Sequence, residues 1–376
     1  MNNLESKEEK STVVVGMSGG VDSSVAALLL KQQGYKVIGL FMKNWDETDE
    51  RGDCPSEREY RDVISVCEKL EIPYYSIEFV EEYRQQVFEH FLESHKKGET
   101  PNPDILCNRE IKFNVFYKKA LSLGADYLAT GHYCQIEKRN GRSSLIKGVD
   151  HSKDQTYFLY TNKSEILDKV LFPIGHLKKV EVRQLAIESG LSVAKKKDST
   201  GICFIGERNF RDFLSQFIAF RRGKFVSLKG EIVGEHVGAA FYTIGQRKGL
   251  GLGGPGEPWF VLKKSMEKNE VTVERGERHP ALYSDACFLR ELSWVDESKC
   301  LVFPFSCHAK VRYRQDDQEC TVVGFSGDAR LEVRFKAPQR AMAMGQAVVF
   351  YNKEVCLGGG FIDRIEDSYY ERKISL

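Results

Sequence analysis

The chain has 376 residues, of which 41% are hydrophobic and 29% are charged, and its formal net charge is +1. This length is too great for one ordinary hydrophobic core and predicts two or three domains in a globular protein. The near-neutral balance excludes binding of nucleic acid through overall basicity, so any RNA-binding surface has to be local.

The N-terminus, MNNLESKEEK, is polar and mixed in charge. It has neither the apolar segment of a secretory signal nor the acid-poor composition of a transit peptide. No apolar run in the sequence is long enough to span a bilayer. We therefore expect a cytoplasmic protein without a membrane partner.

The first half of the chain alternates between strand-like and helix-like segments. Strands are predicted at 12–17, 35–42, 73–80 and 125–130, and helices at 25–34 (closed by Gly34), 56–72 and 111–124. Such alternation is typical of βαβ units around a mainly parallel sheet. In these sheets, ligands bind at the carboxyl ends of the strands.

The pattern changes near residue 209. A helix-like stretch at 209–220 precedes a basic segment and a glycine-rich stretch, and short alternating runs dominate from about 282, at 308–315, 319–325, 330–335, 346–352 and 355–362. Period-two alternation predicts an antiparallel barrel or sandwich. The expected fold is α/β, with an N-terminal parallel-sheet domain (1–208), a small central mixed domain (209–281) and a C-terminal antiparallel β-barrel-like domain (282–376).

The stretch GMSGGVDSS (16–24) lies between the first predicted strand and helix. There, backbone N–H groups and the helix dipole converge on an anion. Gly19 and Gly20 permit close approach of the backbone, the serines add hydroxyl donors, and Asp22 could help to hold a magnesium ion. A simple tight turn would explain the glycines but not the three serines and the acid. The Walker A and dinucleotide-binding fingerprints are absent.

This loop resembles the SGGxDS loop of the PP-loop ATP pyrophosphatase superfamily, whose members cleave ATP between the α and β phosphates and adenylate a substrate oxygen. The superfamily includes amide-forming synthetases as well as thiolases, so the loop alone leaves the reaction open. Further blocks occur in order along the chain: FMKNWDE (41–47), TPNPDILCNREIKF (100–113), ATGHY (129–133), KDQTYFLY (153–160), KKKDSTGICFIGERNF (195–210), GQRKGLGLGG (245–254) and VCLGGGFI (355–362). Together these blocks resemble the bacterial tRNA-specific 2-thiouridylases over nearly the whole chain.

The resemblance implies a tRNA-uridine 2-sulfurtransferase that thiolates the wobble uridine of tRNA. The C2 oxygen would be adenylated with ATP, and sulfur from a cysteine persulfide would replace it, giving 2-thiouridine, AMP and pyrophosphate. ATP is therefore the expected co-substrate, with Mg²⁺. The expected partners are tRNA and a persulfide donor, either a sulfur-relay protein or a cysteine desulfurase.

Two of the ten cysteines are candidates for this chemistry. Cys107 would have a stabilised thiolate if a helix begins at Asn108 or Arg109, because the helix N-terminus and the nearby cations favour the anion. Cys203 lies between two glycines in DSTGICFIGE, which suggests an adaptable loop. The resemblance implies that Cys203 carries the persulfide, that Cys107 is the nucleophile and that Asp104 is a general acid or base. Whether the two cysteines form a disulfide at rest stays open.

The other eight cysteines are expected to be structural. No C-x-x-C pair is present, so the spacing suggests neither a zinc ribbon nor a cysteine-ligated cluster, and no metal site is expected. We expect small apolar packing in strands for Cys134, Cys287, Cys320 and Cys356, whereas Cys54, Cys67, Cys300 and Cys307 have no partner spacing.

The resemblance also implies a set of binding residues. Those implied for ATP are Gly16, Met17, Ser18, Gly19, Gly20, Val21, Asp22, Ser23, Met42 and Gly131. Those implied for tRNA are Asn102, Pro103 and Asp104 at the base, and His132, Lys153, Asp154, Gln155, Arg312, Tyr313, Arg314 and Gln346 elsewhere. From the residues alone, His132 fits a hydrogen-bonded histidine at a strand end equally well, and 153–155 could be a solvated turn.

Local basic patches at 221–224 (RRGK) and 246–249 (QRKG) suit phosphates, although such patches are often only solvated surface. If 311–314 (VRYR) continues a strand, alternation places Arg312 and Arg314 on one face.

Two other functions fit part of the sequence. An amide- or amidine-forming PP-loop synthetase explains the loop but gives Cys107 and Cys203 no task. An RNA-binding protein with ATP as a structural ligand would release no pyrophosphate in response to tRNA.

Overall fold

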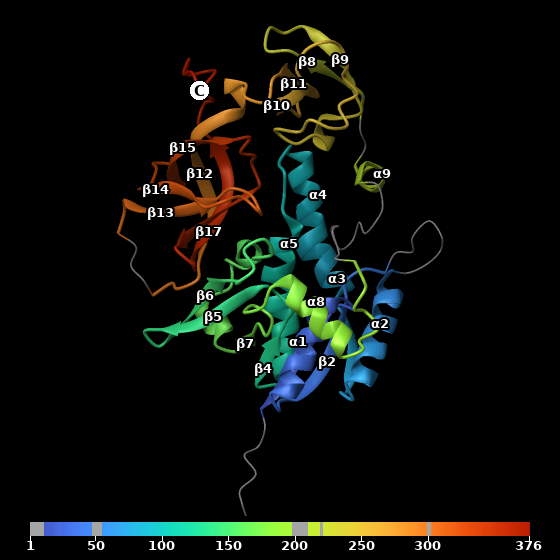
Figure 1. Cartoon of the computed structure of the whole chain (residues 1–376). Helices are drawn as coiled ribbons and strands as arrows, with labels where there is room; N and C mark the ends of the chain where they lie inside the picture. The colour runs from blue at the N-terminus through green and yellow to red at the C-terminus, as the bar shows by residue number, and fades with distance from the viewer. Residues whose placement is uncertain (1–10, 47–54, 198–209, 219–220, 299–301) are drawn as a thin grey trace, which may run out of the picture. The chain divides into compact units, whose positions relative to one another are not determined.

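The computed structural model describes residues 11–46, 55–197, 210–218, 221–298 and 302–376. The chain forms two compact units (Figure 1). The first unit consists of the described residues of Met1–Arg84 and Leu106–Gly206, and the second of those of Gln85–Ile105 and Glu207–Leu376. The polypeptide therefore leaves the first unit after Arg84 and returns to it at Leu106.

The first unit contains a parallel sheet with the strand order β3-β2-β1-β4-β7. Every neighbouring pair in it is parallel, with Val14 of β1 opposite Ile38 of β2 and Leu128 of β4. Parallel strands are covered on both faces, which explains their continuous apolar runs. The strands are β1 (Thr12–Met17), β2 (Lys36–Lys43), β3 (Tyr74–Glu78), β4 (Tyr127–Ala129) and β7 (Val170–Leu171).

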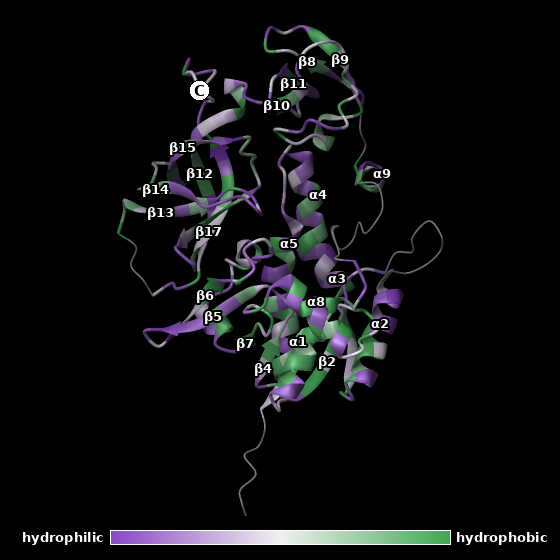
Figure 2. Cartoon of the chain, viewed as in Figure 1, coloured by the Kyte–Doolittle hydropathy of each residue, from purple (hydrophilic) through white to green (hydrophobic). Residues whose placement is uncertain are grey.

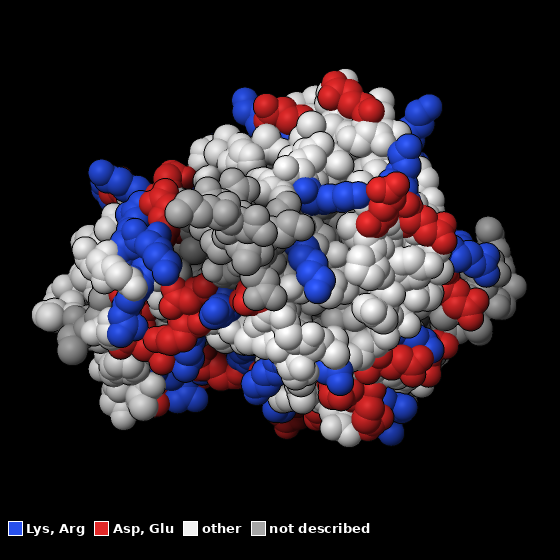
Figure 3. Space-filling view, turned by 90° about the horizontal axis from the view of Figure 1, so that it is seen from below, with Lys and Arg blue, Asp and Glu red and all other residues white. Residues whose placement is uncertain are grey.

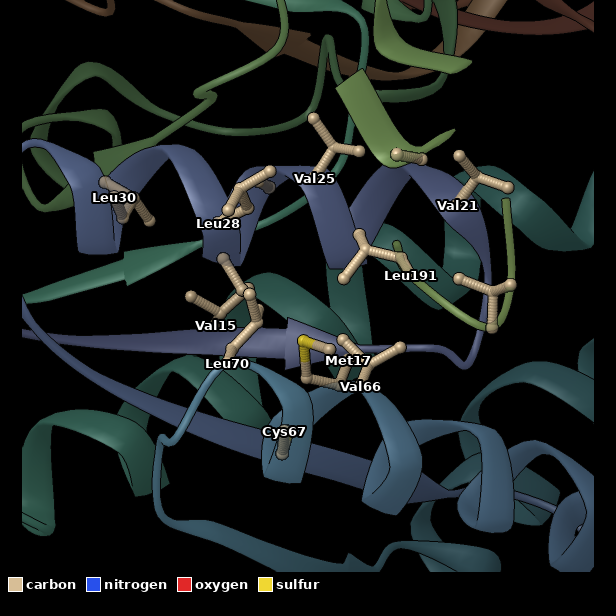
Figure 4. Close-up of a cluster of buried hydrophobic side chains, with 14 of the residues drawn as sticks. Val15, Met17, Val21, Val25, Leu28, Leu30, Val66, Cys67, Leu70 and Leu191 are labelled. Atoms are coloured by element: carbon tan, nitrogen blue, oxygen red, sulfur yellow. The ribbon is translucent and has the colours of Figure 1, made fainter. Parts of the chain in front are cut away.

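Helices pack on both faces of this sheet. Alternate residues of β1, Val13, Val15 and Met17, join a buried cluster with α1, α2 and α8, part of which is drawn in Figure 4. On the other face, Gly16 lies against the ring of Phe116 in η2. Figure 2 shows the hydrophobic residues concentrated along β2 and α1. The principal helices are α1 (Val21–Gln32), α2 (Pro55–Lys69), the π-helical η2 (Cys107–Phe116), α6 (Tyr117–Ser122) and α8 (Lys179–Glu188).

Shorter elements complete the first unit. An antiparallel hairpin pairs β5 with β6, and short helical turns flank it. Of the further helical elements, α3 belongs to the first unit, whereas α4 and nearly all of η1 and α5 belong to the second unit. The bounds are β5 (Cys134–Arg139), β6 (Arg142–Lys147), η3 (Thr156–Phe158), α7 (Ser164–Leu167), α3 (Val80–Tyr83), η1 (Arg84–Phe88), α4 (Glu89–Lys96) and α5 (Pro103–Leu106).

The second unit contains a small mixed sheet with the order β10-β11-β8-β9. Strands β11 and β8 are parallel, whereas the other two pairs are antiparallel. Its core is built around Phe225, Tyr242, Val261 and Val273. The elements are α9 (Phe210–Ser215), β8 (Gly223–Val226), β9 (Ile232–His236), η4 (Ala239–Phe241), β10 (Trp259–Ser265) and β11 (Glu270–Arg275).

An antiparallel barrel follows. Its strands run β12-β15-β14-β13-β16-β17, and the pairing of β12 with β17 closes it. Closure removes the unpaired edges that an open sheet would expose. The strands, with a short turn before them, are η5 (Pro280–Leu282), β12 (Tyr283–Trp294), β13 (Phe305–Lys310), β14 (Gln318–Phe325), β15 (Leu331–Arg340), β16 (Ala347–Asn352) and β17 (Val355–Ile365).

The predicted fold class is confirmed: a parallel α/β part, a central mixed sheet and a C-terminal antiparallel barrel. The domain boundaries at 208/209 and 281/282 stay a prediction. One strand prediction is wrong, because β13 ends at Lys310 and 311–314 form a turn in which Arg314 has a φ of +65°. Alternating side chains therefore do not place Arg312 and Arg314 on one strand face. In the described ranges, no helix is long and apolar enough to cross a membrane.

The contact between β2 and α2 is tight enough to test by substitution. An added Cβ at Gly39 would lie 2.7 Å from Sγ of the fully buried Cys67. We expect Gly39→Ala to lower the free energy of unfolding by about 1–3 kcal/mol through overpacking. In the Gly39→Ala/Cys67→Ala double variant, the new methyl group occupies the space that the thiol vacates. Urea unfolding of the four proteins should therefore show a loss smaller than the sum of the single losses, and strict additivity would contradict this packing.

Candidate functional site

The loop between β1 and α1 has the geometry of an anion-binding turn. Gly19 has a φ of +69°, and an added Cβ would lie 2.5 Å from the Glu59 carbonyl oxygen, so this position requires glycine. The Ser23 hydroxyl accepts from the Ser18 backbone N–H at 3.2 Å, and the Ser24 hydroxyl donates to the Gly20 carbonyl at 2.7 Å. No side chain caps the N-terminus of α1. Its first N–H groups are thus available to an anion, as the loop motif predicts.

Asp22, in the first turn of α1, is held by two residues from distant parts of the chain. The Lys179 ammonium, at the start of α8, donates to both carboxylate oxygens at 2.7 and 2.9 Å. The hydroxyl of the buried Tyr133 donates to Asp22 Oδ1 at 2.8 Å. The Lys179 side chain is only 14% exposed. Neither Lys179 nor Tyr133 was predicted from the sequence, because only the fold brings them to the loop.

A second lysine contacts the same loop. Lys196 donates to the Gly19 carbonyl at 3.0 Å and to Asp62 at 2.6 Å. Burial raises the pKa of the neighbouring Glu59, and the charge of Lys196 opposes this rise. Lys196 belongs to the block 195–210 that carries Cys203, and this block is therefore anchored to the loop at its beginning.

The other residues predicted for ATP lie at the same edge of the sheet. Gly131, just beyond β4, approaches α1 so closely that an added Cβ would lie 2.6 Å from the Ser23 nitrogen. Met42 is on β2, one residue after Phe41, which is paired with Met17 of β1. The structure therefore brings Gly131 together with 16–23 and places Met42 on the adjacent strand.

The helix that carries Cys107 begins earlier than the sequence analysis expected. Asn102 accepts from the Asp104 backbone N–H at 3.2 Å, as an N-cap does, and α5 starts at Pro103. Helical backbone continues through η2 to Phe116. The condition for a stabilised thiolate, a helix that begins at Asn108 or Arg109, is not met, and Cys107 does not lie in the first helical turn, where the N-terminal field is strongest.

Cys107 is 7% exposed and lies at the first residue of the π-helical stretch η2. Such wide turns are uncommon and are often found at functional sites. Arg109, one of the cations near Cys107, is ion-paired with Glu110 at 2.6 Å. The next residue, Asn108, is buried and donates to the Phe158 carbonyl at 3.1 Å. Cys203, the other candidate, lies outside the described residues.

His132 is buried and forms a hydrogen bond between Nδ1 and the Thr130 hydroxyl at 2.7 Å. The rings of Phe113 and Phe172 flank it. Burial holds the pKa of His132 well below its ordinary value, and Lys112 adds to this effect. His132 is therefore a buried, hydrogen-bonded histidine between β4 and β5, and its contact with tRNA stays a prediction.

The segment 153–155 is bound into the first unit by two of its side chains. The carboxylate of Asp154, only 4% exposed, accepts from the Gly148 N–H and from the Thr156 hydroxyl. Gln155 Oε1 accepts from the Tyr133 N–H at 2.9 Å. These two side chains hold the turn, and through Tyr133 they connect it to Asp22.

The remaining predicted tRNA residues belong to the second unit. Gln346 donates to the Thr100 carbonyl at 2.6 Å, two residues before Asn102. Arg312 donates to the Arg340 carbonyl, and Arg314 is exposed in the same turn. Its guanidinium lies 5.3 Å from the ring centroid of Tyr313. Gln346 is thus brought to the predicted base-binding segment by the fold.

Most of the described cysteines that were expected to be structural are buried, but Cys307 is partly exposed and its Sγ lies 3.6 Å from Sγ of Cys320 on the neighbouring strand, a partner that the sequence analysis did not predict. Cys134, Cys287, Cys320 and Cys356 are buried in strands, and Cys67 is buried in α2. Cys54 and Cys300 lie outside the described residues.

Over the described part of the chain, no cluster of three His, Cys, Asp or Glu residues could hold a metal ion. On the face shown in Figure 3, basic and acidic residues are intermixed.

Three family models match consecutive parts of the chain. They are described as a tRNA methyl transferase HUP domain (residues 11–207), a tRNA methyl transferase PRC-barrel domain (211–275) and an aminomethyltransferase beta-barrel domain (284–362). Although two of these descriptions mention methyl transfer to tRNA, relatives that match almost end to end have a different name.

The chain is 58% identical over 370 residues to the tRNA-specific 2-thiouridylase MnmA of Protochlamydia amoebophila, covering 98% of each chain. It is 54% identical over 362 residues to the protein of the same name from Bacillus subtilis, covering 96% of this chain and 97% of that one. The protein from Alkaliphilus oremlandii, also so named, is 56% identical over 364 residues, covering 96% and 99%. At this identity and coverage, the chain belongs to the tRNA-specific 2-thiouridylase family.

Proposed function

We propose that the protein uses ATP to convert the wobble uridine of tRNA into 2-thiouridine. The observation that carries this proposal is the assembly around Asp22 in a member of this family. The loop 16–23, Gly131 and Lys179 meet at the carboxyl edge of a parallel sheet, where such folds bind nucleotides. ATP is the co-substrate that this loop type handles.

In the first step, the C2 oxygen of uridine attacks the α-phosphorus of ATP and pyrophosphate leaves. The backbone N–H groups of the loop and the N-terminus of α1 bind the negative charge. Lys179 supplies a compact cation beside them. Because its ammonium is bound to Asp22 in this structure, a magnesium ion at Asp22 would displace Lys179 toward the phosphates. Asp22 fits such an ion, since Mg²⁺ uses one or two carboxylates together with phosphate oxygens.

In the second step, the terminal sulfur of a persulfide on Cys203 attacks the activated C2 carbon, and AMP leaves with the former oxygen. The Cys107 thiolate attacks Sγ of Cys203, the sulfur–sulfur bond of the persulfide breaks, and a Cys107–Cys203 disulfide remains. Asp104, three residues before Cys107 on one helical run, is the candidate acid or base for these transfers.

The burial of Cys107 favours Cys203 as the persulfide carrier and Cys107 as the nucleophile. A thiol that is 7% exposed is poorly accessible to a bulky protein donor of sulfur. Cys203 belongs to the block that Lys196 ties to the ATP loop. We infer that the sulfur-relay protein or cysteine desulfurase loads Cys203, and that Cys107 acts only inside the site.

Cysteine substitution tests the sulfur step. Cys107→Ser and Cys203→Ser should each abolish 2-thiouridine formation, measured by nucleoside mass spectrometry with ATP, unmodified tRNA and a persulfide donor. ATP binding should be unchanged, because neither residue belongs to the loop. Cys307→Ser, at a partly exposed thiol of the barrel, is the matched control and should retain activity. Thiolation by the Cys203→Ser protein would refute the persulfide assignment.

Lys179→Met tests the activation step. Loss of a cation at the phosphates should lower tRNA-dependent pyrophosphate release by about 10²–10³-fold, as removal of one charge-stabilising donor does in other enzymes. Binding of tRNA should be unaffected. The neighbouring Lys178 is exposed, so Lys178→Met is the control. Pyrophosphate release that does not depend on tRNA would instead favour a different PP-loop reaction.

Arg314→Ala tests the turn at 311–314 as a contact to phosphate. Because Arg314 is exposed while Arg312 is bonded to Arg340, we expect Arg314 to provide the electrostatic contact. The slope of log K against log salt for tRNA binding should decrease by about one. Lys336→Ala, at an exposed lysine of β15 paired with Glu319, should leave the slope unchanged. Equal slopes for wild type and Arg314→Ala would exclude this contact.

A further inference from the structure

The segment just before the predicted base-binding residues is fixed to the barrel by three hydrogen-bonded connections. Glu99 forms a bidentate ion pair with Arg290 of β12, with both N–O distances 3.0 Å. The Thr100 N–H donates to the Met344 carbonyl at 2.8 Å, and Gln346 donates to the Thr100 carbonyl at 2.6 Å. Both backbone polar groups of Thr100 are therefore used in holding this segment in place.

Glu99 is only 7% exposed, so its charge depends on its partners. Arg290 also donates to Asp363 at 3.0 Å, and Asp363 accepts in turn from Arg330. Because Glu99 and Asp363 both accept hydrogen bonds from Arg290, its guanidinium is held in one orientation. A bidentate pair adds geometric precision that a single contact lacks. The acids raise the pKa of Arg290, chiefly through the hydrogen bond to Glu99.

The central sheet contacts the same segment from β10. Burial of Lys264, on β10, lowers its pKa to about 8, and the charge of the nearby Glu99 partly opposes this shift. An added Cβ at Gly98 would lie 2.7 Å from Cγ of Met266, just after β10. Both β structures of the second unit therefore meet at 98–100, the segment that follows α4 (Figure 1).

Thr100, the last residue of this segment, lies two residues before Asn102, the N-cap of the predicted base-binding helix. Asn102 caps that helix, Pro103 starts it, and the same helical run carries Asp104 and Cys107. Fixing Thr100 therefore restricts the positions that Asn102 and Pro103 can adopt. The side-chain amide of Gln346 is turned toward Thr100, so it can act on this segment without touching RNA.

We propose that Glu99, Arg290 and Gln346 are positioning residues for thiolation, holding Asn102–Asp104 in place for the target uridine. The proposal rests on the proposed function and deepens it. It assigns the barrel a role in aligning the base, in addition to any contact with the tRNA backbone. An error of about 1 Å in such alignment can cost about 100-fold in rate.

The test compares Arg290→Met, Arg290→Lys and Glu99→Met/Arg290→Met with wild type in 2-thiouridine formation with ATP, unmodified tRNA and a persulfide donor. Arg290→Met should lower kcat by about 10–100-fold, with KM for tRNA and the Kd values for tRNA and ATP within twofold of wild type. Arg290→Lys should recover part of the loss. The double variant should lose no more than Arg290→Met, because it removes the buried charge that the single variant leaves unpaired.

The matched control is Arg334→Met, on β15 of the same barrel, where Arg334 pairs with Glu332 and Glu366. Its kcat should stay within twofold of wild type. Gln346→Leu removes one hydrogen bond to Thr100 without changing charge. It should lower kcat at unchanged tRNA affinity. This variant tests the positioning role if Arg290→Met fails to fold.

A loss confined to tRNA affinity, with a reduced salt dependence, would show that Arg290 or Gln346 binds RNA directly and would overturn the proposal. Unchanged kcat in folded Arg290→Met and Gln346→Leu proteins would also overturn it. Failure of the wild-type protein to form 2-thiouridine would instead refute the proposed function, whatever the variants do.

Discussion

The negative charge of Asp22 is the constraint on which the site in the first unit depends. A carboxylate at the N-terminus of α1 is stabilised by the helix dipole, but in the proposed function it also lies where the phosphate charge of ATP is bound. Lys179 and Tyr133 neutralise and orient it. Because these residues come from α8 and from the segment after β4, one carboxylate joins three elements at the carboxyl edge of the sheet. The parallel topology makes these contacts possible, because it places the carboxyl ends of all the strands at the same edge of the sheet.

Much of this arrangement is present in the sequence as local pattern. The β-branched run at 12–17 and the glycines of the loop have local physical causes, namely burial on both faces and a positive φ at Gly19. Lys179 has no such signal, because its partner is 157 positions away and a lysine at a helix start is ordinary surface chemistry. Tyr133 has no local signal either. Its sequence position indicates only a buried aromatic residue, and the fold is needed to bring its hydroxyl to Asp22.

Two local errors show where pattern reasoning fails. The sequence VRYR alternates like a strand, but Arg314 adopts a left-handed conformation and the chain turns before β14. The helix that carries Cys107 was expected to begin after the cysteine, although Asn102 and Pro103 are a regular N-cap and first helical residue. In the first case a turn overrides alternation. In the second case, the capping residues are a stronger signal than the charges that follow the cysteine.

The early start of that helix changes how the chemistry of Cys107 has to be explained. A cysteine in the first turn would owe its reactivity to the helix terminus, whereas Cys107 is buried beyond that turn. If Cys107 is the proposed nucleophile, its reactivity depends on alignment with the persulfide more than on exposure. In the proposed function, this alignment depends on the helical run from Pro103, which starts three residues after Thr100, and the barrel holds Thr100 by both backbone groups.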